Sequence, residues 1–534
     1  TNITATRSPA SPTTPSNNVI KWADYSVKQG ETVTYDANNY LNIVTGGNTS
    51  AINGSITGGG DIYLVNPNGV IFGKTASVNV GNLYVSTQET STVGAGDFET
   101  SGTAPLSTTA VGKADVVNMG SITANKVEVY GRSIRILDAA NVHATTSPVI
   151  LHTDTAVNDG YAHIGYKSGA EPAVTAYEVN GANAVAADNY YQLVSTPTEF
   201  QNIKDGLTKN YMLANDIDFY DSTTGTKKSI TPIGSSSSTP FKGKIEGNFY
   251  KVKNYTVQKT AGWDRYGLFG EANGAYIENL GITGVTIELP HTEPQSTYVG
   301  GLVGYTTGNT LLRHVYVTDS KIEGRNQNTG GLVGGSDNTI ITESYSKAET
   351  NGGGILGYAN NTGTVINDVY GDVTPIGTGT YLVYGVRYPG APLPTGPAPT
   401  RSLEVNNSYT TGTIAYTGLT APPVNSTYTV NKSDKKATLF GGGTSATAKD
   451  MNAVATYAGW SINNTGAPGA KWRIYEGRTL PLLTAFMDGT ATATYDIRYF
   501  NANGTLNSDG ANTAKSNEGA DITTGLTYNS QYIK

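Results

Sequence analysis

Short apolar runs separated by glycine and asparagine recur along most of the chain. From Val19 onward apolar and polar positions alternate, and through residues 42–89 a strand-sized run returns about every eight to twelve residues. A period of two predicts strands, and the Gly and Asn residues between the runs predict turns. One stretch, residues 197–207 (PTEFQNIKDGL), fits a short helix with Thr198 as its N-cap. The pattern therefore predicts an all-β chain.

Two related units repeat within this pattern. Residues 53–65 (NGSITGGGDIYLV) and residues 119–131 (MGSITANKVEVYG) share Gly-Ser-Ile-Thr followed by an alternating strand. Neither unit has enough apolar residues to close a core alone, so stacking of successive coils is the economical arrangement. We therefore predict a right-handed parallel β-helix, a solenoid with three strands per coil. Hairpin and loop excursions, such as residues 91–110, are expected to interrupt it.

A second repeat occupies the middle of the chain. Four quartets of the form Gly-apolar-apolar-Gly begin 34, 30 and 23 residues apart. Glycine tolerates positive φ and close approach of another backbone, so the quartets predict tight corners with the apolar pair turned inward. The quartet glycines are Gly267, Gly270, Gly301, Gly304, Gly331, Gly334, Gly354 and Gly357.

Four segments are expected along the chain. Residues 1–18, with three prolines, form a flexible lead-in; residues 19–189 and 190–487 form two β-helix regions, and residues 488–534 begin a further β-rich module that is cut short. Residues 239–257 are expected to form hairpin-like strands. Trp460 and Trp472 are expected to pack the terminal coils.

Composition and charge remove several classes of function. The 534 residues include 65 glycines and 35 tyrosines, which suits many short strands and turns. A net charge of −7 without a dense basic run argues against nucleic acid or an anionic membrane as partner. No apolar run reaches the roughly 18 residues that span a bilayer. The absence of cysteine excludes disulfides and thiol catalysis and favours export.

Candidate catalytic residues are few. Asp216 and Asp218 alternate on one predicted strand, as the paired carboxylates of a polysaccharide-cleaving enzyme would, but a turn-capping role is favoured. No histidine is followed by Glu, as a zinc-peptidase helix requires. The five are interpreted as isolated surface or edge residues: His143, His152, His163, His291 and His314. No cofactor is expected, and calcium at Asp and Asn turns is left open.

The tyrosines allow two interpretations. Exposed tyrosines could bind glycans or proteins, because they offer amphipathic contact area at low entropic cost. The favoured interpretation is that most of them stack in ladders along the coils.

Residues 61–73 (DIYLVNPNGVIFG) place a rigid turn between two strands. Pro67 fixes φ, the side chains of Asn66 and Asn68 can bond nearby backbone, and Gly69 can take positive φ, so a pre-formed corner is predicted. Two more stretches precede it: residues 19–27 (VIKWADYSV), with Trp22, and residues 44–56 (VTGGNTSAINGSI), with Asn48 and Asn53.

In this order, the three stretches resemble the secretion domain of two-partner-secretion exoproteins, the family of the filamentous haemagglutinins and high-molecular-weight adhesins. The resemblance covers most of residues 19–150. The second tetrapeptide of that family is replaced here by Gly47-Asn48-Thr49-Ser50. The four quartets resemble the GLUG repeat of large bacterial surface proteins, over residues 190 to about 485.

The resemblance implies an adhesin secreted to the cell surface of a Gram-negative bacterium. A signal already removed would take it to the periplasm, where the periplasmic domains of a dedicated outer-membrane β-barrel transporter would recognise it. The N-terminal domain would direct secretion and nucleate folding, and the repeats would form a stalk or a contact surface for a host or bacterial glycan or protein. Enzymatic activity is not expected. A secreted polysaccharide-cleaving β-helix enzyme, and the front part of a contact-dependent toxin or haemolysin, are the alternatives.

Overall fold

A computed structural model shows two compact units. Unit 1 is Thr1–Leu193 with Gly466–Ala470, and unit 2 is Val194–Thr465 with Lys471–Lys534. The residues that the structure describes are 3–5, 16–155, 160–173, 175–181, 187–234, 237–257, 259, 264–290, 292–294, 296–325, 328–360, 363–372, 374–376, 381–386, 403–410, 453–464, 470–475, 479–486, 514–515 and 521–522.

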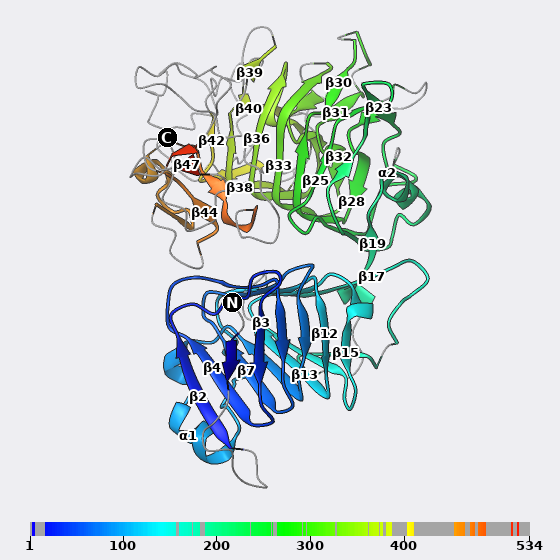
Figure 1. Cartoon of the computed structure of the whole chain (residues 1–534). Helices are drawn as coiled ribbons and strands as arrows, with labels where there is room; N and C mark the ends of the chain where they lie inside the picture. Colours follow the sequence, from blue (N-terminus) through cyan, green and yellow to red (C-terminus); the bar gives the residue numbers. More distant parts are fainter. Residues whose placement is uncertain are drawn as a thin grey trace, which may run out of the picture. The chain divides into compact units, whose positions relative to one another are not determined.

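Unit 1 is built from three parallel sheets (Figure 1). Each consecutive trio of strands from β3 to β17 gives one strand to each sheet, and we call such a trio a rung. The first sheet contains β1 (Ile3–Ala5), β3 (Thr32–Tyr35), β6 (Ser55–Thr57), β9 (Ser77–Asn79), β12 (Ser121–Ala124) and β15 (Val142–Ala144). The second contains β2 (Asn17–Trp22), β4 (Asn39–Val44), β7 (Asp61–Val65), β10 (Asn82–Ser86), β13 (Lys126–Gly131), β16 (Val149–Thr153) and β18 (Tyr177–Val179). The third contains β5 (Ser50–Ile52), β8 (Val70–Phe72), β11 (Val116–Asn118), β14 (Ile134–Ile136), β17 (Ala162–Tyr166) and β19 (Tyr190–Val194).

Strand β7 shows how alternation builds this unit. Ile62 and Leu64 face the main core enclosed by the three sheets, whereas Tyr63 and Val65 face outward. The outer face is also covered, because the excursion between β10 and β11 packs Phe98 of helix α1 (Ala95–Ser101) onto Tyr63. The predicted excursion is therefore present, but it contains a helix as well as loop.

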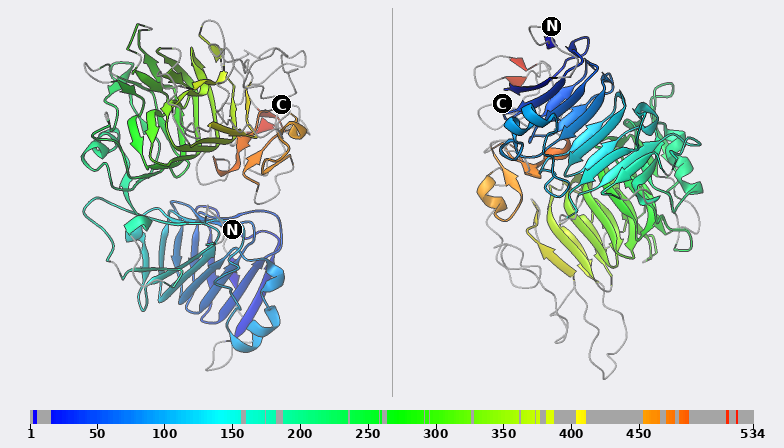
Figure 2. Two further views of the ribbon diagram at one scale, coloured as in Figure 1. Left: turned by 180° about the vertical axis from the view of Figure 1, so that it is seen from behind. Right: turned by 90° about the horizontal axis from the view of Figure 1, so that it is seen from below.

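Unit 2 continues the parallel pairing with longer strands (Figure 2). Its larger sheet stacks β24 (Lys244–Glu246), β25 (Lys251–Lys253) and β26 (Tyr255–Val257) on β29 (Tyr276–Thr283) and β30 (Thr286–Glu288), followed by β33 (Thr310–Glu323), β36 (Thr339–Thr350), β38 (Thr364–Gly371), β39 (Thr374–Pro375), β41 (Leu403–Asn406) and β42 (Tyr409–Thr410). Its second sheet contains β27 (Arg265–Tyr266), β28 (Phe269–Asn273), β31 (Tyr298–Gly300), β32 (Val303–Thr307), β34 (Thr329–Gly330), β35 (Val333–Ser336), β37 (Gly353–Ala359) and β40 (Tyr381–Val386). In unit 2 we use rung for each consecutive set of strands that is shared between these two sheets. Successive rungs are β31–β33, β34–β36, β37–β39 and β40–β42.

Shorter elements complete the two units. The first rungs of unit 2 contain β20 (Tyr211–Leu213), β21 (Ile217–Asp218), β22 (Tyr220–Asp221) and β23 (Thr226–Ile230). The helical pieces are α2 (Pro197–Gln201), η1 (Thr90–Thr92), η2 (Ala139–Asn141), η3 (Ala187–Asn189), η4 (Asn202–Asp205), η6 (Val454–Tyr457) and η7 (Thr484–Phe486). Near the C-terminus β43 (Ile462–Asn463), β44 (Trp472–Arg473) and β45 (Leu482–Leu483) form a small sheet, and β46 (Ala514–Lys515) pairs with β47 (Asp521–Ile522).

Three sequence-based expectations are corrected. The predicted helix is present, but Thr196 caps it rather than Thr198, because Pro197 takes the first helical position and Glu199 completes a capping box with Thr196. Residues 239–257 form no hairpin: β24, β25 and β26 pair in parallel with the next rung. Within the predicted flexible lead-in, β1 pairs with β3.

Candidate functional site

The Asn66–Gly69 corner joins β7 to β8 and is tied by side chains to the preceding rung. Asn66 is fully buried, and its Nδ2 donates to the carbonyl oxygen of Asn48 and to Oγ of Ser50, both at 2.9 Å. Nδ2 of Asn68 donates to the carbonyl oxygen of Gly46 at 2.7 Å. The two asparagine side chains thus satisfy backbone groups of a corner that is already in place one rung earlier.

The backbone of the same corner makes a tight turn and reaches the following rung. The amide of Asn68 donates to Oδ1 of Asn66 at 2.9 Å, and the amide of Gly69 donates to the Asn66 carbonyl at 3.0 Å. Gly69 has a φ of 101°, which a side chain would strain. Toward the next rung, the Asn66 amide donates to the Ser86 carbonyl at 2.9 Å and the Val70 amide to the Asp115 carbonyl at 3.3 Å.

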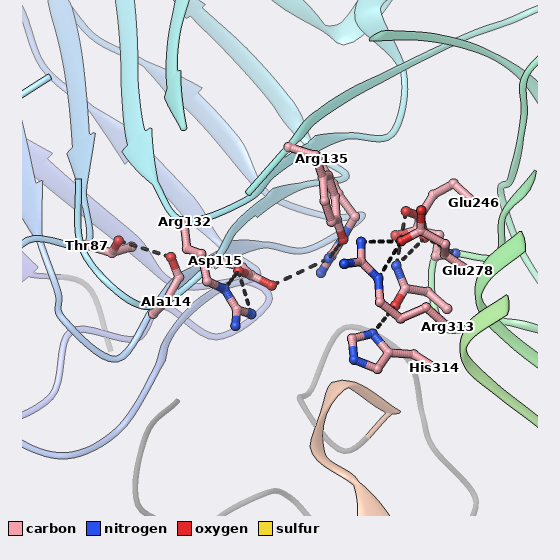
Figure 3. Close-up of polar contacts among 12 residues, drawn as sticks. Thr87, Ala114, Asp115, Arg132, Arg135, Glu246, Glu278, Arg313 and His314 are labelled. Atoms are coloured by element: carbon pink, nitrogen blue, oxygen red, sulfur yellow. Dashed lines mark hydrogen bonds and ion pairs between the residues drawn. The ribbon is translucent and has the colours of Figure 1, made fainter. Parts of the chain in front are cut away.

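Paired charges, of which only Arg135 is buried, stabilise the part of that next rung which contacts the corner. The guanidinium of Arg132 lies 2.9 Å from Oδ1 of Asp115, and the buried Arg135 lies 3.6 Å from Oδ2 (Figure 3). Thr87, at the start of the excursion, donates to the Ala114 carbonyl at 3.1 Å. These contacts close the excursion and return the chain to the stack beside the corner. None of the four residues was singled out from the sequence, because their pairing depends on where the excursion ends.

Trp22 ends strand β2, which pairs with β4 of the rung that precedes the Asn66–Gly69 corner. Its Nε1 donates to Oδ1 of the fully buried Asn42 at 2.9 Å, and Tyr35 donates to the same oxygen at 2.9 Å. Nδ2 of Asn42 donates in turn to the Tyr63 carbonyl at 3.1 Å. Asn42 therefore links three rungs, and the only sequence signal for it is an asparagine inside the apolar run of β4.

The other predicted motif residues, Asn48 and Asn53, lie at two different corners. Asn48 lies under Asn66, and its own side chain donates to Asp24 at 3.2 Å. Asn53 follows β5 at the next corner, where its Oδ1 occupies the space that a Cβ on Gly73 would fill. The Gly47–Ser50 turn thus offers the Asn48 carbonyl and the Ser50 hydroxyl as acceptors to the Asn66–Gly69 corner, and its Thr49 hydroxyl and Ser50 amide donate to the carbonyls of Asn68 and Gly69.

The quartet glycines allow close approach between rungs. At Gly267, Gly301, Gly304, Gly331, Gly334 and Gly357 a Cβ would lie within 2.1–2.8 Å of a backbone atom. None of the eight quartet glycines takes positive φ, so that half of the expectation is wrong. The apolar pairs are turned inward as predicted, and all eight side chains are fully buried in the unit 2 core: Leu268, Phe269, Leu302, Val303, Leu332, Val333, Ile355 and Leu356.

Tyrosines form a ladder on the outside of the larger sheet of unit 2. The rings of Tyr316 and Tyr345 are stacked with centroids 5.0 Å apart, and those of Tyr345 and Tyr370 likewise, with interplanar angles of 9° and 2°. Tyr409 follows in register with Tyr370. These tyrosines are buried, and the ring of Tyr345 uses both its faces on its neighbours. The ladder interpretation is confirmed for this set, which cannot offer ring faces to a sugar.

A buried polar corner runs beside the ladder. Asn279, His314 and Glu343 occupy equivalent positions in consecutive rungs, all with φ between 48° and 55°. His314 lies 3.0 Å from Oδ1 of Asn279 through Nδ1 and 2.8 Å from Oε2 of Glu343 through Nε2. In the adjacent column, Arg313 pairs with Glu278 at 2.5 Å (Figure 3).

Glu343 is held in its ionised form. Burial alone would raise its pKa, but the charge and hydrogen bond of His314, together with Lys471 at 2.5 Å, lower the pKa of Glu343 to about 2. Glu128 in unit 1 is similar: against its burial, hydrogen bonds from His152, Lys126 and Tyr130 lower its pKa to about 2. Both carboxylates therefore stay ionised near pH 7, where they hold side chains of adjacent rungs together and do not exchange protons.

The remaining candidates have structural roles. Asp216 accepts from the Lys251 amide at 3.0 Å, and Asp218 accepts from the Tyr220 amide at 2.9 Å, which supports the capping interpretation. The interpretation of the histidines as isolated is wrong for His314, His152 and His163. His152 contacts Glu128 at 3.0 Å, and His163 stacks between Tyr161 and Tyr191. His143 is exposed, as expected, and His291 lies outside the described residues.

Within the described part of the chain, no group of three or more acidic or histidine side chains could hold a metal ion. No helix among the described residues is long and apolar enough to cross a membrane.

Comparison with known proteins defines the class of the chain. The model of the TPS secretion domain matches residues 2–204, and that of the GLUG motif matches residues 295–323, around Gly301 and Gly304. The chain therefore carries an N-terminal two-partner-secretion domain followed by a GLUG-type repeat, as the resemblance implied. This domain indicates secretion through the periplasm of a Gram-negative bacterium, and the family matches point to an exoprotein rather than an enzyme.

Particular relatives match over shorter stretches. A heme/hemopexin-binding protein of Haemophilus influenzae (strain ATCC 51907 / DSM 11121 / KW20 / Rd) is 42% identical over 74 residues, and another from Haemophilus influenzae is 38% identical over 74 residues. Each match covers 13% of this chain and 8% of the relative. A solved structure assigned as an immunoglobulin A1 protease from Bacteroides ovatus covers 41% of this chain and 65% of its own, at 18% identity and a TM-score of 0.31. That likeness is too low to support an argument.

Proposed function

We propose that this chain is part of a secreted bacterial surface adhesin, exported by a dedicated outer-membrane β-barrel transporter whose periplasmic domains recognise unit 1. In this proposal unit 1 directs secretion and nucleates folding, and the repeats of unit 2 form a stalk or a contact surface. The three-sheet winding of unit 1 is a right-handed parallel β-helix, the hand that parallel crossover connections take. GLUG-type packing extends through the four quartets.

One observation carries the secretion role. Besides the bonds within the corner, the side chains of Asn66 and Asn68 donate backward, to Gly46, Asn48 and Ser50, while the corner backbone supplies partners for the next rung. A chain that emerges N-terminus first can therefore form this corner on rungs already folded, and then template the next rung. Folding outside the cell would help to draw the chain through the transporter.

The proposal is tested by secretion of the full precursor with its transporter. Asn66→Ala and Asn68→Ala should each reduce the amount exported, because each leaves acceptors of the preceding rung unpaired. Asn141→Ala is the matched control, since Asn141 is exposed in the same unit. Wild-type export of both corner variants would refute the role of the corner.

The alternative of a polysaccharide-cleaving enzyme is less well supported. Its best carboxylates, Asp216 and Asp218, are bonded to backbone amides, and both lie within 4 Å of the Lys253 ammonium. The toxin or haemolysin alternative shares the same secretion domain, so the corner variants do not distinguish it from the adhesin. A glycan or protein receptor would be found by binding of the secreted chain to arrays of surface glycans and to intact cells.

A further inference from the structure

A C-terminal segment lies lengthwise across the tyrosine ladder of unit 2. We call the described residues 454–464, 471–475 and 479–486 the strap; they include η6, the β43–β45 sheet and η7. The strap is internally bonded, since the Trp472 amide donates to the Ser461 carbonyl at 2.9 Å and the Thr484 amide to the Lys471 carbonyl at 3.0 Å. It is therefore a small folded piece with a core shared with the ladder.

The order of contacts shows the direction of the strap. Trp460 contacts the last rung, with its ring 5.8 Å from that of Tyr409 and its Nε1 donating to the Asn407 carbonyl at 2.6 Å. Trp472, fully buried, lies 6.0 Å from Tyr370 and 6.3 Å from Tyr345 in the middle rungs.

The far end of the strap reaches the earliest rungs. Phe486 lies 4.9 Å from Tyr316 and 5.4 Å from Phe249, which precedes β25. The strap therefore runs from the last described rung back toward the earlier ones, along the direction in which the rungs stack.

Polar contacts fix the strap in register. The ammonium of Lys471 pairs with Glu343, which His314 also contacts, and the hydroxyl of Tyr370 donates to the Pro481 carbonyl at 3.0 Å. Aromatic contacts hold it at both ends and in the middle, and ionic and hydrogen bonds position it between them.

We propose that the strap is a closing clamp that makes the rungs of unit 2 fold and unfold as one cooperative block. A stack of rungs that contact only their neighbours can fray from its ends, because each rung opens at the cost of one interface. A segment that contacts four successive rungs couples their opening, since releasing any of them disrupts the same docked piece. The clamp can close only after the chain has been made, or exported, as far as Phe486. This inference does not depend on the proposed adhesin function.

Native-state hydrogen exchange of the full chain, measured against denaturant concentration, tests the clamp. In the wild type, the amides of β33, β36 and β38 should exchange through one common opening. In Trp472→Ala they should separate into graded openings, with protection in β38 reduced roughly a hundredfold. Lys471→Met, a milder change, should lower protection across the same strands by a smaller factor, whereas Lys321→Met, which removes an exposed ion pair with Glu288 and Glu323, should not.

One result overturns the clamp. If Lys471→Met keeps both the common opening and the protection of the wild type, the strap is a passive cover. Lys471→Met leaves the aromatic contacts in place. Its hydrogen exchange can therefore still be measured if Trp472→Ala fails to fold.

Discussion

At the scale of single residues, the stack is specified by a few buried polar side chains rather than by its apolar ones. Any apolar residue of suitable size can fill a rung, but Asn42 and Asn66 bond to groups in particular neighbouring rungs. A shift of one rung by one residue would leave these groups unpaired in a buried environment, which is costly. The asparagines therefore act mainly on register.

Replacement of Asn66 measures this effect on stability. Asn66→Ala should lower the free energy of unfolding of unit 1 by about 1–3 kcal/mol, because the Asn48 carbonyl and the Ser50 hydroxyl lose a buried donor. Urea denaturation followed by circular dichroism would measure the change. The exposed control, Asn141→Ala, should change it by less than about 0.5 kcal/mol.

A second residue-scale prediction concerns acid. The pKa of Glu343 is lowered from 4.5 to about 2, so its ionised form contributes stability above pH 4.5 that is lost as the pH falls toward 2. The stability of unit 2 should fall over that window, and Glu343→Gln should flatten the fall. Denaturation midpoints at a series of pH values measure this loss of stability. An equally steep loss in Glu343→Gln would contradict the role of the ionised Glu343 carboxylate.

At the scale of elements, the sequence predicted the strands better than their partners. Alternation in residues 61–65 and the quartets identified strands and corners, because these are local patterns. The parallel partners of β24–β26 and the end of the excursion at Asp115 depend on contacts between residues far apart in sequence, and a hairpin was the nearest local alternative. The sequence predicted the ladder of tyrosines. Of the strap that covers it, the sequence predicted only that Trp460 and Trp472 pack against coils.

The quartets give a prediction at this scale. A Cβ on Gly334 would lie 2.5 Å from the Val299 nitrogen and 2.6 Å from the Gly304 carbonyl oxygen. Both atoms belong to the backbone of paired strands, which cannot shift to make room without breaking their pairing. Gly334→Ala should therefore destabilise unit 2 by roughly 1–3 kcal/mol. Gly47→Ala, where a Cβ meets nothing within 4 Å and φ is not positive, is the control and should be nearly neutral by denaturant unfolding.

At the scale of the whole molecule, the largest apolar clusters of the two units are separate among the described residues. The unit 1 core and the unit 2 core share no residues. Scanning calorimetry should therefore show that Asn66→Ala lowers one transition and Gly334→Ala lowers another. A single transition shifted equally by both variants would show that the two cores unfold together.

We propose that the Asn66–Gly69 corner acts on export through folding of the early rungs. The refolding rate of purified Asn66→Ala, set beside its export in cells that carry the transporter, tests this role. Refolding and export should fall together, with Asn141→Ala unchanged in both. Loss of export with wild-type refolding and stability would contradict it, because the corner would then be a recognition site for the transporter.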